Sequence, residues 1–427
     1  MRERLQISSA FVMLLAMTTL CSGCGAEREQ VGEDTATVIE QETISEEMQS
    51  VSENAEESQS TESTSSADDL QQDNPDTETE SFVSDRSAVF NLLSQMTIGW
   101  NLGNTFDAFG AGNTLDAETY WGNPKTTEEM IRTVHDQGFN TIRIPVTWAE
   151  HVGPAPDYRI DDAWINRVQE VVDYAYEDGM FVLLNTHHET EFWMNTDPAK
   201  EERVTAELTA IWTQIAGHFK DYNDHLIFEG MNENRIKGSA DEWNGGTADE
   251  RAVINRLNQA FIDAVRATGG KNETRCLVIS TYGNNAGYTA VKELEIPQDD
   301  NIAVALHMYT PYVFTYEADS GNISTWDGEK KKEIVATMKQ VEKYLLKNDV
   351  PVIVTEFGAV NKNNSKEVIK WAGDYLGTMN SFGVKCIWWD NGIYEGTGEK
   401  FGIFDRNNLT WYDPELADTL IAAVRTE

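Results

Sequence analysis

Two glutamates follow apolar runs at points where their charge is costly to bury. Glu233 ends the segment 225–233, His-Leu-Ile-Phe-Glu-Gly-Met-Asn-Glu, and Glu356 follows the segment 351–355, Pro-Val-Ile-Val-Thr. An ionised carboxylate held away from water is unfavourable unless it is paired, so stability alone does not explain such endings. Two of them in one domain predict a pair of carboxylates facing each other across a pocket. That pair is the minimal machinery for cleaving a glycosidic bond.

Eight short apolar runs are the expected strands that would position these glutamates. They cover residues 97–101, 141–146, 181–186, 226–229, 276–281, 302–307, 352–355 and 384–388. Helical patterns lie between most of them, at residues 126–138, 162–178, 247–268, 329–347, 365–380 and 414–426, with at most a brief helix near Ala290. Thr126 and Glu129 predict a capping box at the start of the first of these.

The alternation of strands and helices predicts an α/β fold of the (β/α)8 TIM-barrel type. Eight such units over about 340 residues fall within the usual size of that barrel. A doubly wound sheet is the alternative, but no glycine-rich phosphate-binding fingerprint follows the first expected strand.

Polar side chains gather at the C-terminal ends of the expected strands, where barrel active sites form. One such residue is easily a satisfied hydrogen-bonding group, whereas seven strands ending in this way are difficult to explain by packing. In chain order the candidates are Asn104, Arg143, His187, His188, Asn232, Glu233, His307, Tyr309, Glu356 and Trp389.

The charges of the candidates predict different roles for the two glutamates. Two carboxylates in one pocket repel each other, so their pKa values separate. We expect Arg143 and the hydroxyl of Tyr309 to keep Glu356 ionised, and Glu233 to hold its proton. Asn232, directly before Glu233, is placed to hydrogen-bond a sugar 2-hydroxyl.

Aromatic rings can stack on the apolar faces of sugars, and Trp389 is the best candidate for such a platform. Five further residues lie on or just after the expected strand ends, and each of them either contacts a sugar or packs locally: Asn104, Trp148, Trp193, Trp243 and Trp326. Three other tryptophans lie on helices, and we expect them in the core: Trp164, Trp212 and Trp371.

The sequence His187-His188-Glu189 raises the alternative of a metal site. Adjacent residues of a regular strand point to opposite faces, so His187 and His188 are not expected to reach one ion. We therefore expect sugar contacts from His187, and from His188 if it also faces the pocket, and no metal.

Seven motifs carry a family resemblance: Gly-Trp-Asn-Leu-Gly-Asn-Thr-Phe-Asp (99–107), Arg-Ile-Pro-Val (143–146), Asn-Thr-His-His (185–188), Phe-Glu-Gly-Met-Asn-Glu (228–233), His-Met-Tyr-Thr-Pro (307–311), Thr-Glu-Phe-Gly (355–358) and Trp-Trp-Asp-Asn-Gly (388–392). Together they resemble glycoside hydrolase family 5, and most of all its subfamily 4 of endo-β-1,4-glucanases, which includes xyloglucanases. The resemblance covers roughly residues 86–427.

The resemblance implies a retaining endo-β-1,4-glucanase that acts on β-1,4-glucans such as cellulose, mixed-linkage glucan and xyloglucan, without a cofactor. It implies that Glu233 is the acid/base and Glu356 the nucleophile. The family's other active-site residues fall on Arg143, His187, Asn232, His307, Tyr309 and Trp389.

One position departs from the family pattern, which usually has Pro after the acid/base glutamate. This chain has Asn234, followed by Arg235. Loss of Pro frees φ and adds an N–H, which puts the rigidity of Glu233 in question. This departure supports one alternative, a catalytically impaired glycan-binding protein of the cell surface. A β-mannanase or xylanase with the same chemistry is a separate alternative, because the residues that recognise the sugar 2-hydroxyl and any side branches decide the substrate.

Composition separates the N-terminal part of the chain from the rest. Residues 25–85 hold 19 Asp and Glu against one Arg, and every Trp and Tyr lies after residue 85. Such a segment cannot bury enough apolar surface to fold, so we expect a disordered linker at 25–85 and one catalytic domain at 86–427. The formal net charge of −39 argues against nucleic-acid binding.

The first 24 residues predict a targeting signal. A basic start precedes an apolar run at 10–20 that is too short to cross a bilayer, and Cys-Ser-Gly-Cys follows. This resembles a bacterial lipobox with Cys24 as the lipidation site, and the alternative is an ordinary secretory signal that is cleaved nearby and leaves a secreted protein. We expect an exported monomer whose contact with the membrane is a lipid anchor. Cys276 and Cys386 lie in expected core strands and are interpreted as buried free thiols, with a disulfide as the alternative.

Overall fold

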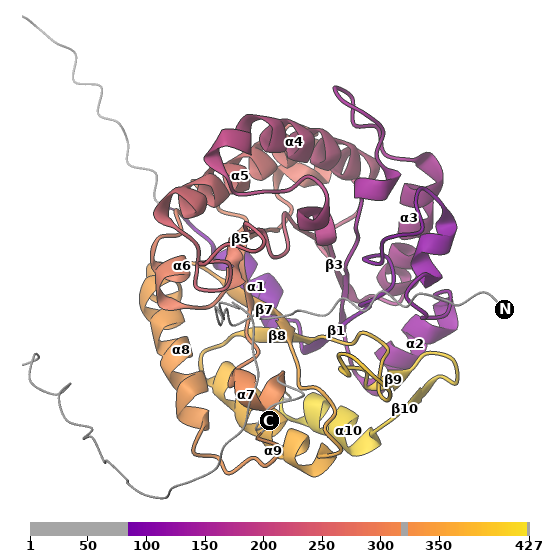
Figure 1. Cartoon of the computed structure of the whole chain (residues 1–427), viewed down its shortest axis with the longest axis vertical. Helices are drawn as coiled ribbons and strands as arrows, with labels where there is room; N and C mark the ends of the chain where they lie inside the picture. The colour runs from indigo at the N-terminus through magenta and orange to yellow at the C-terminus, as the bar shows by residue number, and fades with distance from the viewer. Residues whose placement is uncertain (1–83, 317–322, 425–427) are drawn as a thin grey trace, which may run out of the picture. The chain divides into compact units, whose positions relative to one another are not determined.

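Eight parallel strands close into a barrel in the computed structural model, which describes residues 84–316 and 323–424 (Figure 1). Each strand pairs with its neighbours in chain order, and β1 also pairs with β8. The (β/α)8 prediction is confirmed. The strands are β1 (Ile98–Asn101), β2 (Thr141–Ile144), β3 (Phe181–Asn185), β4 (Leu226–Glu229), β5 (Leu277–Asn285), β6 (Ile302–His307), β7 (Val352–Phe357) and β8 (Lys385–Trp388).

Almost every strand residue is buried, which explains why the strands read as continuous apolar runs rather than alternating ones. The C-terminal ends of β7 and β4 differ from the predicted ends, and this changes where the two glutamates lie. Strand β7 extends through Glu356 to Phe357, so this glutamate lies inside the strand. Strand β4 ends at Glu229, and Glu233 lies in the loop beyond it.

Apart from α1, the helices lie around the barrel (Figure 1). The helices are α1 (Ser87–Ser94), α2 (Glu128–Gln137), α3 (Asp162–Glu177), α4 (Glu201–His218), α5 (Ala248–Arg266), α6 (Tyr288–Lys292), α7 (Tyr312–Thr315), α8 (Lys331–Tyr344), α9 (Ser365–Ser381) and α10 (Pro414–Ala422). Two short strands, β9 (Phe404–Asp405) and β10 (Thr410–Trp411), form a separate hairpin after β8.

Helix α2 begins one residue later than the predicted capping box requires. Thr127 is its N-cap, and its hydroxyl accepts a hydrogen bond from the backbone N–H of Met130. The prediction of a box from Thr126 to Glu129 is therefore wrong, because the N–H of Thr126 donates to Glu118 instead. A complete capping box is present at α5, where Thr247 and Glu250 cap each other.

Helix α1, which the sequence pattern did not predict, lies inside the ring of the other helices (Figure 1). Its apolar side chains pack against residues that fill the barrel interior, including Phe181, Ile353 and Ile387. It precedes β1 and so covers the N-terminal ends of the strands. The C-terminal ends are left for the candidate site.

Several predictions from the sequence concern residues outside the described ranges. The signal at 1–24, Cys24 and the linker up to residue 83 lie there and stay predictions. Cys276 and Cys386 are buried and unpaired, as expected. Within the described ranges, no helix combines the length and apolar character that crossing a bilayer requires.

Candidate active site

Arg143, near the end of β2, is buried in the middle of the C-terminal end of the barrel. Its guanidinium donates to both oxygens of Glu229, to Oε1 of Glu356, and to the side-chain oxygens of Asn101 and Asn232. These bonds use every N–H that a guanidinium has. Burial acts to lower the pKa of Arg143, but the charges of Glu229 and Glu356 raise it. Arg143 is therefore a permanent cation of fixed orientation.

Glu356 is held at both carboxylate oxygens. Oε1 accepts from Arg143 at 2.7 Å, and Oε2 accepts from the hydroxyl of Tyr309 at 2.9 Å. Burial, followed by the charge of Glu356, raises the pKa of Tyr309 well above its ordinary value, so this phenol remains a neutral donor. Both contacts were predicted from the sequence. They leave the carboxylate little freedom to rotate, as a nucleophile aimed at one carbon requires.

Glu233 faces Glu356 from the loop after β4. Its Oε1 accepts from Nδ1 of His307 at 2.8 Å, and the same nitrogen lies 3.4 Å from Oε2 of Glu356. One oxygen of each glutamate and one ring nitrogen of His307 lie within 4.8 Å of one another. The side chain of Glu233 is 22% exposed and that of Glu356 is 6% exposed, so a ligand reaches Glu233 more readily.

The pKa values of the two glutamates move in the direction opposite to the prediction. Burial raises the pKa of Glu356, and the charge of Glu233 adds to this against the effects of His307 and Arg143. Burial also acts to raise the pKa of Glu233, but the hydrogen bond and charge of His307, together with Arg235, lower it. The expectation of a protonated Glu233 is wrong for the unliganded site, because it did not place His307 against this carboxyl.

His187 contributes an N–H at the floor of the pocket. The amide oxygen of Asn185 accepts from the N–H of Val146, so its amide nitrogen faces Nδ1 of His187 at 3.1 Å. This contact is shorter than the one between the amide nitrogen of Asn232 and Nε2, so we assign the acceptor role to Nδ1 and the proton to Nε2. Burial lowers the pKa of His187 well below its usual value, so the ring is neutral. Nε2 lies 4.0 Å from Oε1 of Glu356 and 3.5 Å from the amide nitrogen of Asn232.

His188 lies on the same side as His187, contrary to the prediction. The two ring centroids are 4.5 Å apart, because the backbone of His187 (φ −106°, ψ −84°) leaves the strand conformation and a 3-10 helix starts at His188. Nε2 of His188 lies 3.6 Å from Oδ2 of Asp107. Adjacent side chains point to opposite faces only within a strand, and β3 ends at Asn185, before either histidine.

Two groups of side chains have the residue types and spacing that a metal ion needs. They are Glu233, His307 and Glu356, and Asp107, His187 and His188, each with ligand atoms within 4.8 Å of one another. In the second group, Asp107 already accepts from the backbone N–H groups of residues 104 and 105. In the first, the oxygens accept from Arg143, Tyr309 and His307. These donors favour hydrogen bonding of the carboxylates over metal binding. The absence of a metal stays a prediction.

Trp389 covers one side of the pocket. Its ring is parallel to that of His187, with 5.6 Å between centroids. Gly103 makes room for it, since a Cβ at that position would lie 2.9 Å from the indole and 2.8 Å from the carbonyl oxygen of Asp390. Asn104 follows with a left-handed backbone (φ 56°) and is half-buried.

The burial of the other tryptophan candidates separates those that pack in the interior from the one that is half-buried. Trp148, Trp193 and Trp326 are buried, which favours the packing interpretation for each. Trp243 is half-buried beneath the guanidinium of Arg235. The prediction of core positions is confirmed for Trp164, Trp212 and Trp371.

Arg235 fixes the segment in which Asn234 replaces Pro. Nη1 of Arg235 donates to the backbone carbonyl of Glu233 at 2.6 Å, and Nε donates to Glu242 at 3.0 Å. Its guanidinium lies 4.0 Å above the ring centroid of Trp243. Asn234 is buried, and its backbone oxygen accepts from the N–H of Gly283. The segment that carries Glu233 is thus held by side-chain contacts.

Sequence reasoning missed three site residues besides Arg235. Glu229 shares Arg143 with Glu356, and its place at the end of an apolar run was the available signal. Tyr316 donates its hydroxyl to Glu399, and burial raises the pKa of Glu399, with further contributions from the charges of Glu233 and Glu356. No local pattern distinguishes Tyr316 or Glu399 from ordinary loop residues.

Comparison with known proteins places this geometry in a family. Residues 103–395 match the model of Cellulase (glycosyl hydrolase family 5). Endoglucanase A of Ruminococcus albus is 51% identical over 343 residues, which cover 79% of this chain and 93% of that protein.

Solved structures give the same result. A family 5 xyloglucan-specific endo-β-1,4-glucanase from a metagenomic library, in complex with cellotriose, is 56% identical with a TM-score of 0.78, covering 79% of this chain and 99% of the other. A subfamily 4 broad-specificity endoglucanase from Ruminococcus champanellensis with bound cellotriose is 43% identical with a TM-score of 0.75, covering 78% and 97%.

Proposed function

The chain belongs to glycosyl hydrolase family 5, and on this premise we infer that it is a retaining endo-β-1,4-glucanase. The observation that carries the chemistry is the pair Glu233 and Glu356, with an oxygen of each within 4.8 Å of the other. Retaining glycosidases have carboxyl groups about 5–5.5 Å apart, whereas inverting ones need about 6.5–9.5 Å to admit a water molecule. The short separation supports retention.

In the first half-reaction, Glu356 attacks the anomeric carbon while Glu233 donates its proton to the leaving glycosidic oxygen. The glycosidic C–O bond breaks as an ester bond to Glu356 forms. Arg143 and Tyr309 orient the attacking carboxylate. In the unliganded site each of them donates one hydrogen bond to one oxygen of Glu356, so the orientation of the carboxylate is set before attack.

In the second half-reaction, Glu233 takes a proton from water, and the water oxygen attacks the anomeric carbon. The ester bond breaks and Glu356 leaves as a carboxylate. Glu233 has regained its proton, so the site is ready for another cycle. Arg143 again faces the charge that is released.

The acid step requires Glu233 to hold a proton that His307 disfavours in the unliganded site. A sugar bound over the 22% exposed carboxyl removes its remaining contact with water. Greater burial raises the pKa of a carboxylic acid. We propose that substrate binding converts Glu233 into the acid.

The proposed substrates are β-1,4-glucans, including xyloglucan and mixed-linkage glucan. The xyloglucan-specific relative at 56% identity supports xyloglucan, and the broad-specificity relative supports a wider range. A panel of carboxymethylcellulose, mixed-linkage glucan, xyloglucan, xylan and mannan tests this proposal through the release of reducing sugars. Cleavage of xylan or mannan alone would replace it with the xylanase or mannanase alternative.

The same assay tests the roles of the glutamates. Glu356→Ala and Glu233→Ala should each lose nearly all activity on the preferred glucan, while Glu329→Gln, a change at an exposed side chain, should keep it. Unchanged reducing-sugar release by Glu356→Ala would contradict the assignment. Tight oligosaccharide binding by the unmodified chain without cleavage would favour the impaired binding protein.

We also propose that the chain is exported and anchored to a bacterial membrane through Cys24. The basic start, the short apolar run and the small residues before Cys24 support this. Metabolic labelling with a fatty acid in a bacterial host should mark the chain, and Cys24→Ser should abolish the label. Labelling that persists in Cys24→Ser would contradict the anchor.

A further inference from the structure

Strand β5 changes conformation near its C-terminal end. Its register with β6 shifts between Ser280 and Asn285. Within this irregular segment, Gly283 (φ 59°) and Asn284 (φ 49°) both have left-handed backbones. Asn284 is completely buried, and a left-handed residue other than glycine carries strain that persists only where the surrounding structure imposes it. A function of the Asn284 side chain would explain why the strained conformation is kept.

The irregular segment contacts both the loop that carries Glu233 and the histidine that faces this glutamate. The backbone N–H of Gly283 donates to the carbonyl oxygen of Asn234 at 3.1 Å, one residue after Glu233. The side-chain nitrogen of Asn284 lies 3.4 Å from Nε2 of His307. On the other side of the ring, Nδ1 lies 2.8 Å from Oε1 of Glu233. Asn284 is therefore linked to the acid/base through the imidazole ring of His307.

The surroundings of His307 decide which of its nitrogens must carry the proton. Nδ1 faces the carboxylates of Glu233 and Glu356, at 2.8 Å and 3.4 Å, and an N–H is attracted to both of them. A neutral imidazole has one N–H, so Nε2 must then act as an acceptor. The amide nitrogen of Asn284 is the donor that Nε2 needs. A hydrogen bond of 3.4 Å is weak, so its main effect is on the choice of tautomer.

The orientation of the Asn284 amide agrees with this arrangement. Its oxygen is buried and has no hydrogen-bond partner among the residues that the structure describes, which is unfavourable for a carbonyl group. Turning the amide over would place this oxygen against Nε2 of His307 and draw the ring proton there, away from Glu233. The unpaired oxygen is thus the consequence of keeping a donor against the ring.

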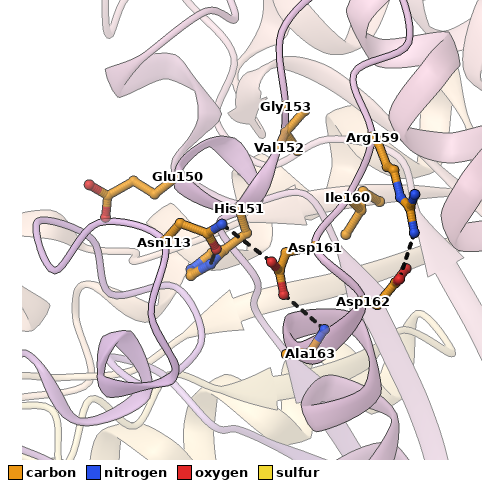
Figure 2. Close-up of a pocket in the computed structure, with 10 residues that line it drawn as sticks. All are labelled: Asn113, Glu150, His151, Val152, Gly153, Arg159, Ile160, Asp161, Asp162 and Ala163. Atoms are coloured by element: carbon orange, nitrogen blue, oxygen red, sulfur yellow. Dashed lines mark hydrogen bonds and ion pairs between the residues drawn. The ribbon is translucent and has the colours of Figure 1, made fainter.

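A second asparagine–histidine pair in this chain has the opposite arrangement (Figure 2). Asn113 and His151 line a cavity of about 540 Å³, and the amide nitrogen of Asn113 donates to Asp161 at 3.3 Å. The amide oxygen of Asn113 therefore faces Nδ1 of His151, at 3.0 Å, and accepts from it. Burial lowers the pKa of His151 to about 4, so this ring is neutral with its proton on Nδ1. An asparagine amide thus selects the tautomer of a histidine elsewhere in the same molecule.

We propose that Asn284 is a positioning residue for the acid/base: it donates a hydrogen bond to Nε2 of His307 and so keeps the proton of the neutral ring on Nδ1, against Oε1 of Glu233. The effect of Asn284 on the reaction rests on the proposed function. When the N–H of Nδ1 occupies Oε1, the acidic proton of Glu233 lies on Oε2, from which the leaving glycosidic oxygen can take it. With the ring proton on Nε2 instead, Nδ1 would accept the proton of Glu233 and hold it away from the substrate.

Nuclear magnetic resonance of the histidine rings tests the position of the proton directly. Long-range proton–nitrogen correlation spectra of the chain with nitrogen-labelled histidine distinguish protonated from unprotonated ring nitrogens, and His307→Gln identifies the signals of His307. At a pH where this ring is neutral, the unmodified chain should carry the proton on Nδ1. Asn284→Asp replaces the donor by an acceptor and should move the proton to Nε2, while His151 stays unchanged as an internal reference. A proton on Nε2 in the unmodified chain, or an unchanged tautomer in Asn284→Asp, would overturn the proposal.

Two substrates that differ in their leaving group test the consequence for catalysis. Asn284→Gly removes the side chain and suits the left-handed backbone, because glycine adopts positive φ freely. It should lower kcat/KM on a soluble β-1,4-glucan about tenfold or more, since the leaving sugar needs a well-placed proton. On dinitrophenyl cellobioside, whose leaving group departs without a proton, the decrease should stay below about threefold. A purely structural defect would lower both values alike.

Asn363→Gly is the matched control, since Asn363 is exposed and has a similar backbone conformation (φ 58°). It should change neither value, and Tm values show whether each variant is folded. Equal losses on both substrates, or rates of folded Asn284→Gly that match those of Asn363→Gly, would overturn the positioning role. If Asn284→Gly does not fold, the same comparison with Asn284→Asp decides. The ring spectra do not depend on activity, so a chain that cleaves no glucan would overturn only the proposed function.

Discussion

Nη1 of Arg235 donates to the backbone carbonyl oxygen of Glu233 at 2.6 Å, and the same nitrogen lies 3.7 Å from the Glu233 carboxylate. One side chain thus holds the backbone of the acid/base and acts on its charge. The family resemblance described above implies Pro at the position of Asn234. In this chain the contacts of Arg235 with Glu242 and Trp243 take over the restraint of that loop.

Arg235→Met should lower kcat on the preferred glucan by about tenfold or more, because a small displacement of the acid is costly. The charge of Arg235 helps to lower the pKa of Glu233, so its removal should move the alkaline limb of the pH profile to higher pH. Arg235→Lys keeps the charge and should keep the limb in place. Arg132→Met, at an exposed ion pair, is the control. An unmoved limb in Arg235→Met would contradict this account.

The pH profiles of kcat/KM and kcat should differ on the alkaline side. The limb of kcat/KM reports Glu233 in the free enzyme, where His307 lowers its pKa. Bound substrate buries the carboxyl further and raises that pKa, so the limb of kcat should lie at higher pH. Initial rates across the pH range at several substrate concentrations give both profiles. Coincident alkaline limbs would show that substrate does not convert Glu233 into the acid.

Arg143→Met should destabilise the fold by about 3–5 kcal/mol, because it leaves Glu229 and Glu356 buried without their cation. Adding Glu229→Gln removes one of these charges and should recover a substantial part of that loss. Urea unfolding measures both variants. The double variant should still be nearly inactive, since Glu356 has lost its partner. Equal stability of the single and double variants would show that Glu229 does not depend on Arg143.

His151 should make the protein less stable as the pH falls. Burial lowers its pKa to about 4, and its ring stacks on Trp164 at 3.7 Å. Between about pH 6.5 and 4 the unfolded chain binds a proton that the folded chain does not, so stability is lost as pH falls through this window, by up to about 3 kcal/mol. His151→Phe keeps a stacked ring and should flatten this slope in urea unfolding at pH 4–7. An unchanged slope would mean that His151 does not titrate differently on folding.

The sequence was sufficient for the barrel because its strands are buried on both faces and read as apolar runs separated by helices. It was also sufficient for the contacts of Glu356, since β2, β6 and β7 must meet at one end of a barrel. The sequence did not predict side-chain directions where the backbone leaves the strand conformation. His187 and His188 face one side because the strand ends at Asn185, which a strand pattern does not show.

The remaining errors concern side-chain partners contributed by distant segments. The pKa order of the two glutamates depends on Nδ1 of His307, a residue at which the register between β6 and β7 shifts. Trp148 is buried and therefore packs in the interior. Its place near a strand end did not distinguish packing from a sugar contact.

The central claim is that Glu356 forms a covalent bond with the sugar. Incubation of the enzyme with a 2-deoxy-2-fluoro cellobioside that carries a good leaving group, followed by peptide mass spectrometry, tests it most directly. We expect the added mass of one 2-deoxy-2-fluorocellobiosyl group on the peptide that contains Glu356, and specifically on that residue. A label on another residue, or turnover with no labelled peptide, would contradict it.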